Sequence, residues 1–473
     1  MEKLVENILN IPAETQIIEF KRLIGKEVVK KVIRAVVGMA NAEGGIIILG
    51  IDDPEKTNFN GLDRIYGIEE DLDNYDAIFR EIENIIPPVV TVKSDTIKVA
   101  ENKTIALLHV PKATGCFLSI NNQVWIRLNK GNKKLTPQEI IKMSYVKGFE
   151  KADKELVDVD FELLQTSFFD DWRKSRKITS GDIKDILFQT GLAKKNDVGE
   201  LMPLRAAVLL FAQFPTNLMD TKCAIRVYKY KGVGEMFQEV PNLIGKPKTI
   251  EGPIINLIKN AHEYILGILE SGIEMQSGFV TKYKVPERAV KEAITNAVIH
   301  RDYNMKRDIE VKIFESRIEI VSPGLFPYNI TKRNIGRVRA DGYRNDLLVK
   351  HLREFLDPPN LDRNEGVQAM RNEMDKQNLF PPMFFTYPLL EDSVETILFN
   401  EERPSEWEKV SEYLKNNKYI TNKVARDITG IVQMDKMSKL FKKWVGQGFL
   451  EKIVPKSGGT RGIKYKLSNN DEI

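Results

Sequence analysis

The feature that most constrains the fold lies near the N-terminus, where a helix-like pattern gives way to a strand-like one. Apolar side chains recur at helical spacing across residues 26–41, and residues 46–51 then form an apolar run interrupted only by glycine. Gly44 and Gly45 lie between the two patterns and favour a tight exit from the helix. A short apolar run of this kind predicts a strand buried on both faces. The sequence therefore predicts helices packed against a sheet, an α/β (α+β) class.

The rest of the chain predicts three domains, because 473 residues exceed what one core usually serves. A helix opened by Pro137 ends a first domain at 1–150, and Glu401-Glu-Arg-Pro404 indicates a linker between a domain at 151–400 and a tail at 401–473. Within the middle domain we expect these elements, in order: strands at 205–211 and 224–230, helices at 253–270 and 286–300, and a hairpin at 309–321.

Composition narrows the classes of function. Apolar runs stay far below the roughly 20 residues that span a bilayer, so we expect no membrane partner and a cytoplasmic location. The two cysteines, Cys116 and Cys223, are far apart, and the four histidines do not have metal-ligand spacing. Zinc and disulfides are therefore disfavoured, and any metal is expected to be magnesium or manganese held by carboxylates.

Charge is distributed unevenly along the chain. Residues 404–467 carry 14 Lys/Arg against 6 Asp/Glu, whereas the whole chain has a net charge of +4. A basic tail on a slightly acidic body is typical of contact with DNA or RNA. A solvated lysine-rich surface is the alternative.

Four separated segments of the first domain resemble the Schlafen AlbA-like domain. They are Glu14-Thr-Gln-Ile-Ile-Glu19-Phe-Lys21, Ala40-Asn-Ala-Glu-Gly-Gly45 with the strand that leads to Asp52-Asp53, Val110-Pro, and Trp125-Ile-Arg127. The resemblance covers roughly residues 8–145, with its motifs in the expected order. It implies a nucleic-acid-binding domain.

Nuclease-active members of the Schlafen family use Glu-x4-Glu and a downstream aspartate, so the resemblance implies Glu14, Glu19 and Asp52 or Asp53 as catalytic residues. Glu14, Glu19 and Asp52 would hold a divalent cation that activates water. Two observations favour a binding module instead. A spacing of five puts the glutamates on opposite faces of an ideal strand, and Glu19 has Lys21 and Arg22 nearby for an ion pair.

A short basic cluster follows in the same domain. Arg127, Lys130, Lys133 and Lys134 are candidates for contact with phosphates on a Schlafen-like domain. On charge alone, a solvated loop explains them equally well.

The helix opened by Pro286 resembles the N-box of the GHKL ATP-binding superfamily. Glu292, Asn296 and His300 lie one turn apart and share one helical face. The resemblance implies that Glu292 polarises water, that Asn296 coordinates magnesium and that His300 lies near the phosphates of ATP. The resemblance also implies that Gly324, in the turn that contacts adenine, and Gly366, in the lid over the phosphates, belong to the ATP site.

This second resemblance, over roughly 150–400, departs from the family in two places. Ser322-Pro323-Gly324-Leu325 replaces the usual Asp-x-Gly-x-Gly turn that recognises adenine, and Asn364-Glu365-Gly366-Val367 keeps one glycine of the phosphate lid. A GHKL-shaped scaffold without nucleotide is therefore the alternative to ATP binding. No Gly-x4-Gly-Lys-Ser/Thr motif occurs, which excludes a Walker-type ATPase or helicase.

The tail has the order of a winged helix-turn-helix. We expect helices at 405–416, 421–430 and 433–446, then two strands around a glycine-rich wing. In the third helix Met437, Leu440, Phe441 and Trp444 are expected to face inward. The predicted DNA contacts are Lys436, Lys439, Lys442 and Lys443 on that helix and Lys456 and Arg461 on the wing.

Three functional interpretations follow. The first is a binding protein, a DNA-binding transcriptional regulator with a degenerate ATP-binding domain. The second is a metal-dependent nuclease acting on RNA or single-stranded DNA in host defence, and a weak ATPase activity is a further enzymatic alternative. A partner-binding scaffold is the third interpretation. Winged-helix regulators often dimerise on symmetric sites, so a homo-oligomer is also expected.

Overall fold

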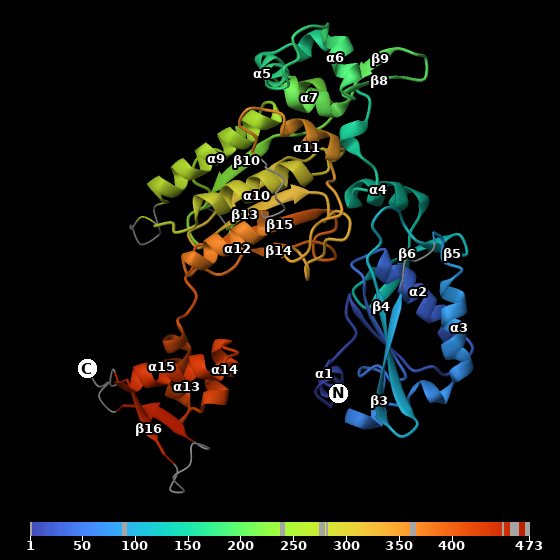
Figure 1. Ribbon diagram of the computed structural model, residues 1–473, viewed down its shortest axis with the longest axis vertical. Coiled ribbons are helices and arrows are strands. Elements are labelled where there is room, and N and C mark those ends of the chain that lie inside the picture. Colours follow the sequence, from blue (N-terminus) through green and yellow to red (C-terminus); the bar gives the residue numbers. More distant parts are fainter. Residues whose placement is uncertain are drawn as a thin grey trace. The chain divides into compact units, whose positions relative to one another are not determined.

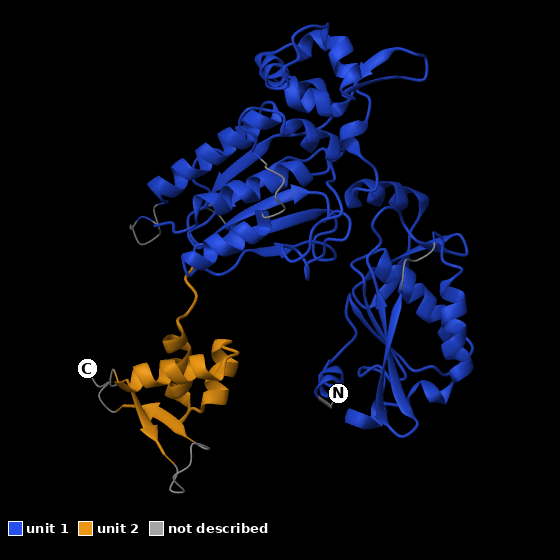
Figure 2. Ribbon diagram, viewed as in Figure 1, with its two compact units in different colours: residues 1–400 blue, residues 401–473 orange. Residues whose placement is uncertain are grey.

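The computed structural model describes residues 2–87, 92–236, 242–273, 280, 282–359, 366–446, 449–454 and 463–468. The chain forms two compact units, Met1–Asn400 and Glu401–Ile473 (Figure 2). Both helices and sheets build the chain, so the predicted mixed α/β, multi-domain class is confirmed. Within the described residues, we find no helix that combines the length and the hydrophobicity of a transmembrane segment.

The first part of the larger unit is built on a four-stranded sheet with the order β1-β2-β4-β3. The strands are β1 (Ile18–Lys21), β2 (Gly45–Leu49), β3 (Lys93–Ala100) and β4 (Lys103–Val110). Strands β1 and β2 are parallel, so the chain must cross over between them, and helix α2 (Val28–Ala40) makes that connection. The helix and strand predicted at 26–41 and 46–51 are therefore confirmed. Helices α1 (Glu2–Leu9) and α3 (Leu72–Ile82) belong to the same part (Figure 1).

A smaller sheet of β5 (Ser119–Ile120), β6 (Gln123–Leu128) and β7 (Gly131–Lys134) is fixed to the end of α2 by Asn41. The buried Asn41 amide donates to the carbonyls of Leu118 and Trp125, both at 2.8 Å, and its Oδ1 accepts from the Leu118 amide at 2.7 Å. Gly44 follows with φ +69°, and a Cβ there would lie 2.7 Å from the Val110 carbonyl oxygen. Position 44 therefore requires glycine, because any side chain there would collide with the backbone of Val110.

The second part of this unit is built on a six-stranded sheet with the order β11-β10-β12-β13-β15-β14. Its strands are β10 (Ile225–Lys229), β11 (Lys248–Ile250), β12 (Ile309–Ile313), β13 (Arg317–Pro323), β14 (Met383–Phe385) and β15 (Ser393–Phe399). Helices α9 (Ile254–Ser271), α10 (Glu287–His300) and α12 (Gly366–Lys376) lie together over this sheet (Figure 1). The predicted helices and hairpin of this region are confirmed.

The strand predicted at 205–211 is wrong, because this segment is helix α7 (Arg205–Phe211). Residues 206–211 are all buried, so the helix has no polar face and its sequence has no helical period. Helix α7 contacts α5 (Ser167–Ser175), α8 (Pro215–Leu218) and α11 (Asp346–Leu352). Helix α6 (Ile183–Gln189) contacts the hairpin of β8 (Ala193–Lys195) and β9 (Leu201–Pro203). Their core is continuous with that of the six-stranded sheet.

The smaller unit contains α13 (Glu406–Asn416), α14 (Asn422–Thr429), α15 (Met434–Gly446), β16 (Leu450–Ile453) and β17 (Lys464–Leu467). Strands β16 and β17 form an antiparallel pair, and Ile420 exchanges two backbone hydrogen bonds of 2.9 Å with Tyr465 of β17. Met437, Phe441 and Trp444 of α15 are buried in its core, as predicted, and Leu440 is partly buried against it. The predicted order of three helices and two strands is confirmed.

Candidate functional site

The predicted carboxylates converge because the chain turns tightly before β1. The Thr15 amide donates to the Ile18 carbonyl at 2.9 Å, so Glu14 folds back beside the strand. Its Oε1 then accepts from the Phe20 amide at 3.1 Å. Glu14 and Glu19 therefore lie close together despite a spacing of five, because the segment between them is not an ideal strand.

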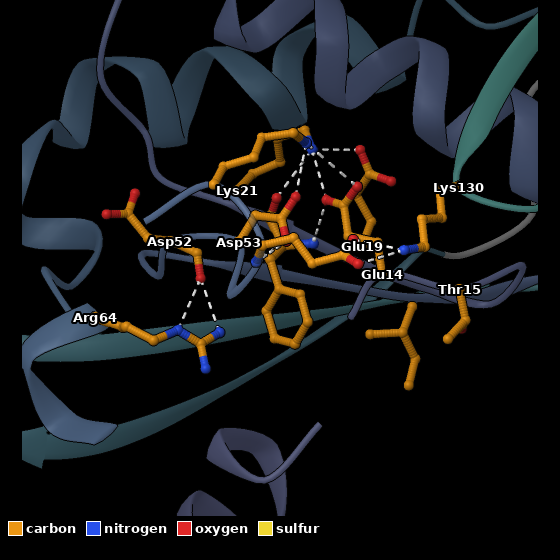
Figure 3. Close-up of polar contacts among 12 residues, drawn as sticks. Glu14, Thr15, Glu19, Lys21, Asp52, Asp53, Arg64 and Lys130 are labelled. Carbon is orange, nitrogen blue, oxygen red and sulfur yellow. Dashed lines mark hydrogen bonds and ion pairs between the residues drawn. The ribbon is translucent and has the colours of Figure 1, made fainter. Parts of the chain in front are cut away.

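Cationic side chains occupy the space among these carboxylates (Figure 3). Lys21 Nζ lies 3.1 Å from Glu14 Oε1 and also pairs with Glu19. Arg127 pairs with the other oxygen of Glu19. Lys56 Nζ lies 2.7 Å from Asp53 Oδ2 and 3.7 Å from Glu14 Oε2. The cluster is a network of buried and partly buried ion pairs.

Asp53, rather than Asp52, belongs to this cluster. Figure 3 shows the Asp52 carboxylate pointing away from Lys21, while the Asp52 carbonyl accepts from Arg64 Nη2 at 2.9 Å. Burial alone would raise the pKa of Asp53, but the hydrogen bonds from Lys56 and from the Glu55 amide outweigh burial and lower it. Asp53 is therefore ionised at neutral pH.

The arrangement does not fit a divalent cation as it stands. Among the residues that the structure describes, no group of three or more His, Cys, Asp or Glu side chains has the geometry to hold a metal. The ammonium of Lys21 lies between Glu14 and Glu19, where a shared cation would lie. Metal binding by Glu14, Glu19 and Asp52 and catalysis by these residues and Asp53 stay predictions.

The basic cluster predicted next to these residues does not form one open surface. Arg127 is 0% exposed, pairs with Glu19 and donates to the Thr15 carbonyl at 2.9 Å, which leaves it no surface for a phosphate. Lys130 and Lys133 are exposed but pair with Glu55 and Glu139. Lys134 is exposed on β7. The interpretation of Arg127 as a phosphate contact is thus replaced by a structural role.

All five predicted cofactor-binding residues line one cavity of about 730 Å³. Glu292, Asn296 and His300 come from one face of α10, Gly324 follows β13, and Gly366 begins α12. A Cβ at Gly366 would lie 2.8 Å from Glu292 Oε2 and 3.2 Å from Asn296 Nδ2. A larger residue at position 366 would therefore have to displace the Glu292 carboxylate and the Asn296 amide.

The cavity has a polar end and an apolar wall. Arg288 and Lys291 join Glu292 and Asn296 at the polar end, which α10 supplies. The apolar wall comes from the sheet and from residues 325–338 and includes Ile320, Leu325, Phe326, Ile335, Phe384 and Val394. This division suits a ligand with a flat apolar ring at one end and anionic groups at the other.

His300 faces this cavity in its neutral form. Burial, with a smaller effect of the nearby Arg344, lowers the pKa of His300 to about 4. Its ring is parallel to that of Tyr343, with the centroids 5.4 Å apart. At neutral pH His300 can therefore stack or hydrogen-bond but cannot supply positive charge to a phosphate.

The departures from the GHKL pattern persist in the structure. The buried Ser322 donates its hydroxyl to the Ala297 carbonyl at 2.8 Å, so this position ties β13 to α10 instead of offering a carboxylate to a base. Residues 364 and 365 of the predicted lid lie outside the described residues. Asn296 remains the predicted magnesium ligand.

Arg344 is the main residue that sequence reasoning missed. Its fully buried guanidinium donates to the carbonyls of His300 at 2.8 Å, Val146 at 2.6 Å and Leu325 at 2.5 Å, and also to that of Tyr145. The neighbouring Asn345 donates to the carbonyls of Ile299 and Arg301, both at 2.9 Å. The Arg344-Asn345 motif therefore fixes the end of α10 and the cavity wall.

Two further side chains join the first part of the unit to this wall. Lys112, buried beside Glu43 at 3.4 Å, donates to the carbonyls of Phe326 at 3.1 Å and Ile330 at 2.7 Å. Tyr387 donates its hydroxyl to the Arg127 carbonyl at 2.9 Å. Contacts at such long sequence separation carry no signal in a single sequence.

With this geometry established, comparisons with known proteins identify two of the domains. Residues 14–136 match the family model described as "Schlafen, AlbA_2", and residues 306–388 match the one described as "Putative ATP-dependent DNA helicase recG C-terminal", of HATPase type. The chain carries a Schlafen AlbA_2 domain and an ATPase-like domain. The resemblance to the Schlafen AlbA-like domain and the presence of an ATPase-like domain are thereby confirmed, while the N-box helix lies just before the second matched segment. The matched segments leave residues 401–473 uncovered.

The solved structures that are similar to the chain include the DIP2311 protein from Corynebacterium diphtheriae. It has 19% sequence identity and a TM-score of 0.40, with 99% of this chain and 96% of that chain covered. No curated protein matches the sequence.

The buried Lys147, between the segments that match the AlbA_2 and ATPase-like families, should make the stability of the protein depend on pH. Lys147, at the end of α4 (Pro137–Lys147), is buried and donates to the Ala42 carbonyl at 3.2 Å. Burial, and next the charge of Lys112, lower the pKa of Lys147 to about 7 from its ordinary 10.5. Between these values the unfolded chain binds more protons, so the stability of the wild type rises with pH by at most about 1.4 kcal/mol per pH unit.

We expect Lys147→Met to remove this rise. Urea denaturation should show the wild type gaining stability relative to the variant as pH rises from about 7 to about 9. Lys142→Met, at an exposed position of the same helix, should track the wild type at every pH. Parallel curves for wild type and Lys147→Met would show that Lys147 is not a buried titrating group.

Proposed function

We propose that this protein is a DNA-binding regulator whose tail unit contacts duplex DNA and whose ATPase-like domain binds a nucleotide. The observation that carries the proposal is the row of exposed lysines on α15. Lys436, Lys439, Lys442 and Lys443 are all exposed, while the opposite face of the helix is buried. A helix that follows a helix-turn-helix and presents such a row suits the major groove and its flanking phosphates.

The rest of the tail unit supports this reading. Its three helices and β16–β17 pair have the order of a winged helix. The predicted wing contacts, Lys456 and Arg461, lie outside the described residues. The AlbA_2 match adds a second domain of a nucleic-acid-related type. DNA rather than RNA is the proposed target, because α15 suits the wide major groove of B-form DNA better than the narrow one of RNA.

The cavity of the ATPase-like domain is the proposed nucleotide site. Its polar end offers Arg288 and Lys291 to phosphates and the side-chain oxygens of Glu292 and Asn296 to magnesium, which suits a hard cation. The apolar wall would cover the ring of the base. Magnesium, when bound, would neutralise phosphate charge. The stacked, neutral His300 would position the nucleotide without adding charge.

The DNA proposal is tested by changing charge on α15 alone. Replacing Lys436, Lys439, Lys442 and Lys443 by Gln should weaken binding to a labelled duplex and reduce the slope of log affinity against log salt by roughly 3 to 4, because each phosphate contact contributes about 0.9. Fluorescence anisotropy at several salt concentrations measures both quantities.

The matched control removes the same charge elsewhere. Lys177, Lys184, Lys194 and Lys195 are exposed in the larger unit, and their replacement by Gln should leave the salt slope unchanged. Equal losses in the two quadruple variants would mean that net charge, not α15, governs binding.

The nucleotide proposal is tested by filling the space at the start of α12. Gly366→Val places a side chain against Glu292 and Asn296 and should abolish the heat of ATP binding in isothermal titration. Asn296→Ala should keep binding but lose most of its dependence on magnesium. Gly115→Val, at a position with no neighbouring atom within 4 Å, is the matched control. A folded wild type that gives no heat with ATP and magnesium would refute this part of the proposal.

A nuclease is the second candidate function, and the convergence of Glu14, Glu19 and Asp53 favours it. The cations among these carboxylates oppose it. We therefore expect no cleavage of labelled tRNA, single-stranded DNA or duplex DNA with magnesium or manganese. Cleavage that disappears in both Glu19→Ala and the more conservative Glu14→Gln would instead establish the nuclease and make the ATPase-like domain its regulator.

A further inference from the structure

The turn between α14 and α15 exposes two large apolar side chains in the tail unit. Val432 is 85% exposed and Met434 is 62% exposed, and Gln433 between them is also exposed. Their neighbour Ile431 is buried in the core. Single exposed apolar residues are common on proteins, but a pair at the start of a lysine-rich helix needs a physical reason.

Polar contacts hold this turn in place. Arg426 of α14 donates to the Val432 carbonyl at 3.1 Å, and its Nε donates to Asn422 Oδ1 at 3.1 Å. Asn422 in turn donates to the Ser438 hydroxyl of α15 at 3.0 Å. Gly430 ends α14 with φ +78°. The backbone that carries Val432 and Met434 is therefore fixed, and the two side chains are presented to the outside at a defined position.

The charge of the same helix indicates what covers them. Four exposed lysines follow Met434 along α15, and Asp435 is the one acidic residue within the helix. Such a surface complements a polyanion better than an apolar protein surface. On the base edges of the major groove, the apolar group is the C5-methyl of thymine.

We propose that Val432 and Met434 contact thymine methyl groups, so that the protein prefers A·T-rich duplex DNA. This inference rests on the proposed function and assigns its sequence preference. Gln433 lies between the two apolar residues, and a Gln amide can pair with the N6 and N7 atoms of adenine. Asp435 is exposed in the first turn of α15, where a carboxylate oxygen can accept from the N6 amino group of adenine. The segment 432–435 thus offers apolar and polar groups that match one A·T pair or two adjacent pairs.

The test removes the methyl group and nothing else. Fluorescence anisotropy competition with full-length protein would compare alternating poly(dA-dT) with poly(dA-dU), which differ only at C5 of the pyrimidine. We expect the wild type to bind the thymine polymer roughly 3- to 10-fold more tightly, because the uracil polymer lacks about one to two methyl contacts with the protein. The double variant Val432→Ser/Met434→Ser should bind both polymers equally.

The matched control is Val198→Ser/Val233→Ser, which removes two exposed apolar side chains from the larger unit. It should retain the full preference for thymine. All four positions are exposed, so the substitutions should leave the fold intact.

The outcomes separate this inference from the proposed function. Salt-dependent binding of the wild type to both polymers with equal affinity would overturn the inference and leave the DNA-binding function standing. A thymine preference that survives in Val432→Ser/Met434→Ser would overturn the assignment to these residues. Failure to bind either polymer, or any duplex, would overturn the proposed function itself.

Discussion

The larger unit depends on one buried cation, the guanidinium of Arg344. It is nearly inaccessible, and its hydrogen bonds go to main-chain carbonyls of Tyr145, Val146, His300 and Leu325, which come from three separate segments. Burial lowers the pKa of Arg344 to about 10, yet the group stays charged at neutral pH. A buried charge is tolerated only while its hydrogen bonds are satisfied. The three segments must therefore keep their relative positions, and with them the end of α4, the end of α10 and one wall of the cavity.

The AlbA_2 domain also supports the wall of the cavity through direct hydrogen bonds. Lys112 from that domain holds the carbonyls of Phe326 and Ile330, and both residues line the cavity. Tyr387 holds the Arg127 carbonyl, and Arg127 in turn pairs with Glu19. A ligand that shifts residues 325–330 must change the contacts of Lys112 as well. Coupling of this kind is reciprocal, so if the proposed ligand shifts residues 325–330, a change in the position of Lys112 also changes the affinity for that ligand.

How well the sequence predicts each feature depends on how far apart along the chain the interacting residues lie. The shared face of Glu292, Asn296 and His300 follows from the period of a helix alone, and the buried strand β2 follows from its apolar run. Helix α7 was mistaken for a strand because complete burial removed its period. The ion pair of Glu19 with Arg127 joins positions more than a hundred residues apart. No local pattern contains such a contact, so the burial of Arg127 could not be read from its neighbours.

The two basic regions differ in what a phosphate must displace. On the AlbA_2 domain Lys130 and Lys133 already pair with Glu55 and Glu139, so a phosphate there competes with carboxylates of the protein itself. On α15 the four lysines share their helix with one acidic residue, Asp435 in the first turn. Exposed ion pairs are worth at most about 1 kcal/mol each, so the competition is modest at one site but adds up over several. Counterion release, by contrast, favours the region whose charges are not already neutralised. In the proposed function, electrostatics therefore favours the four lysines of α15 over Lys130 and Lys133 as contacts for DNA phosphates.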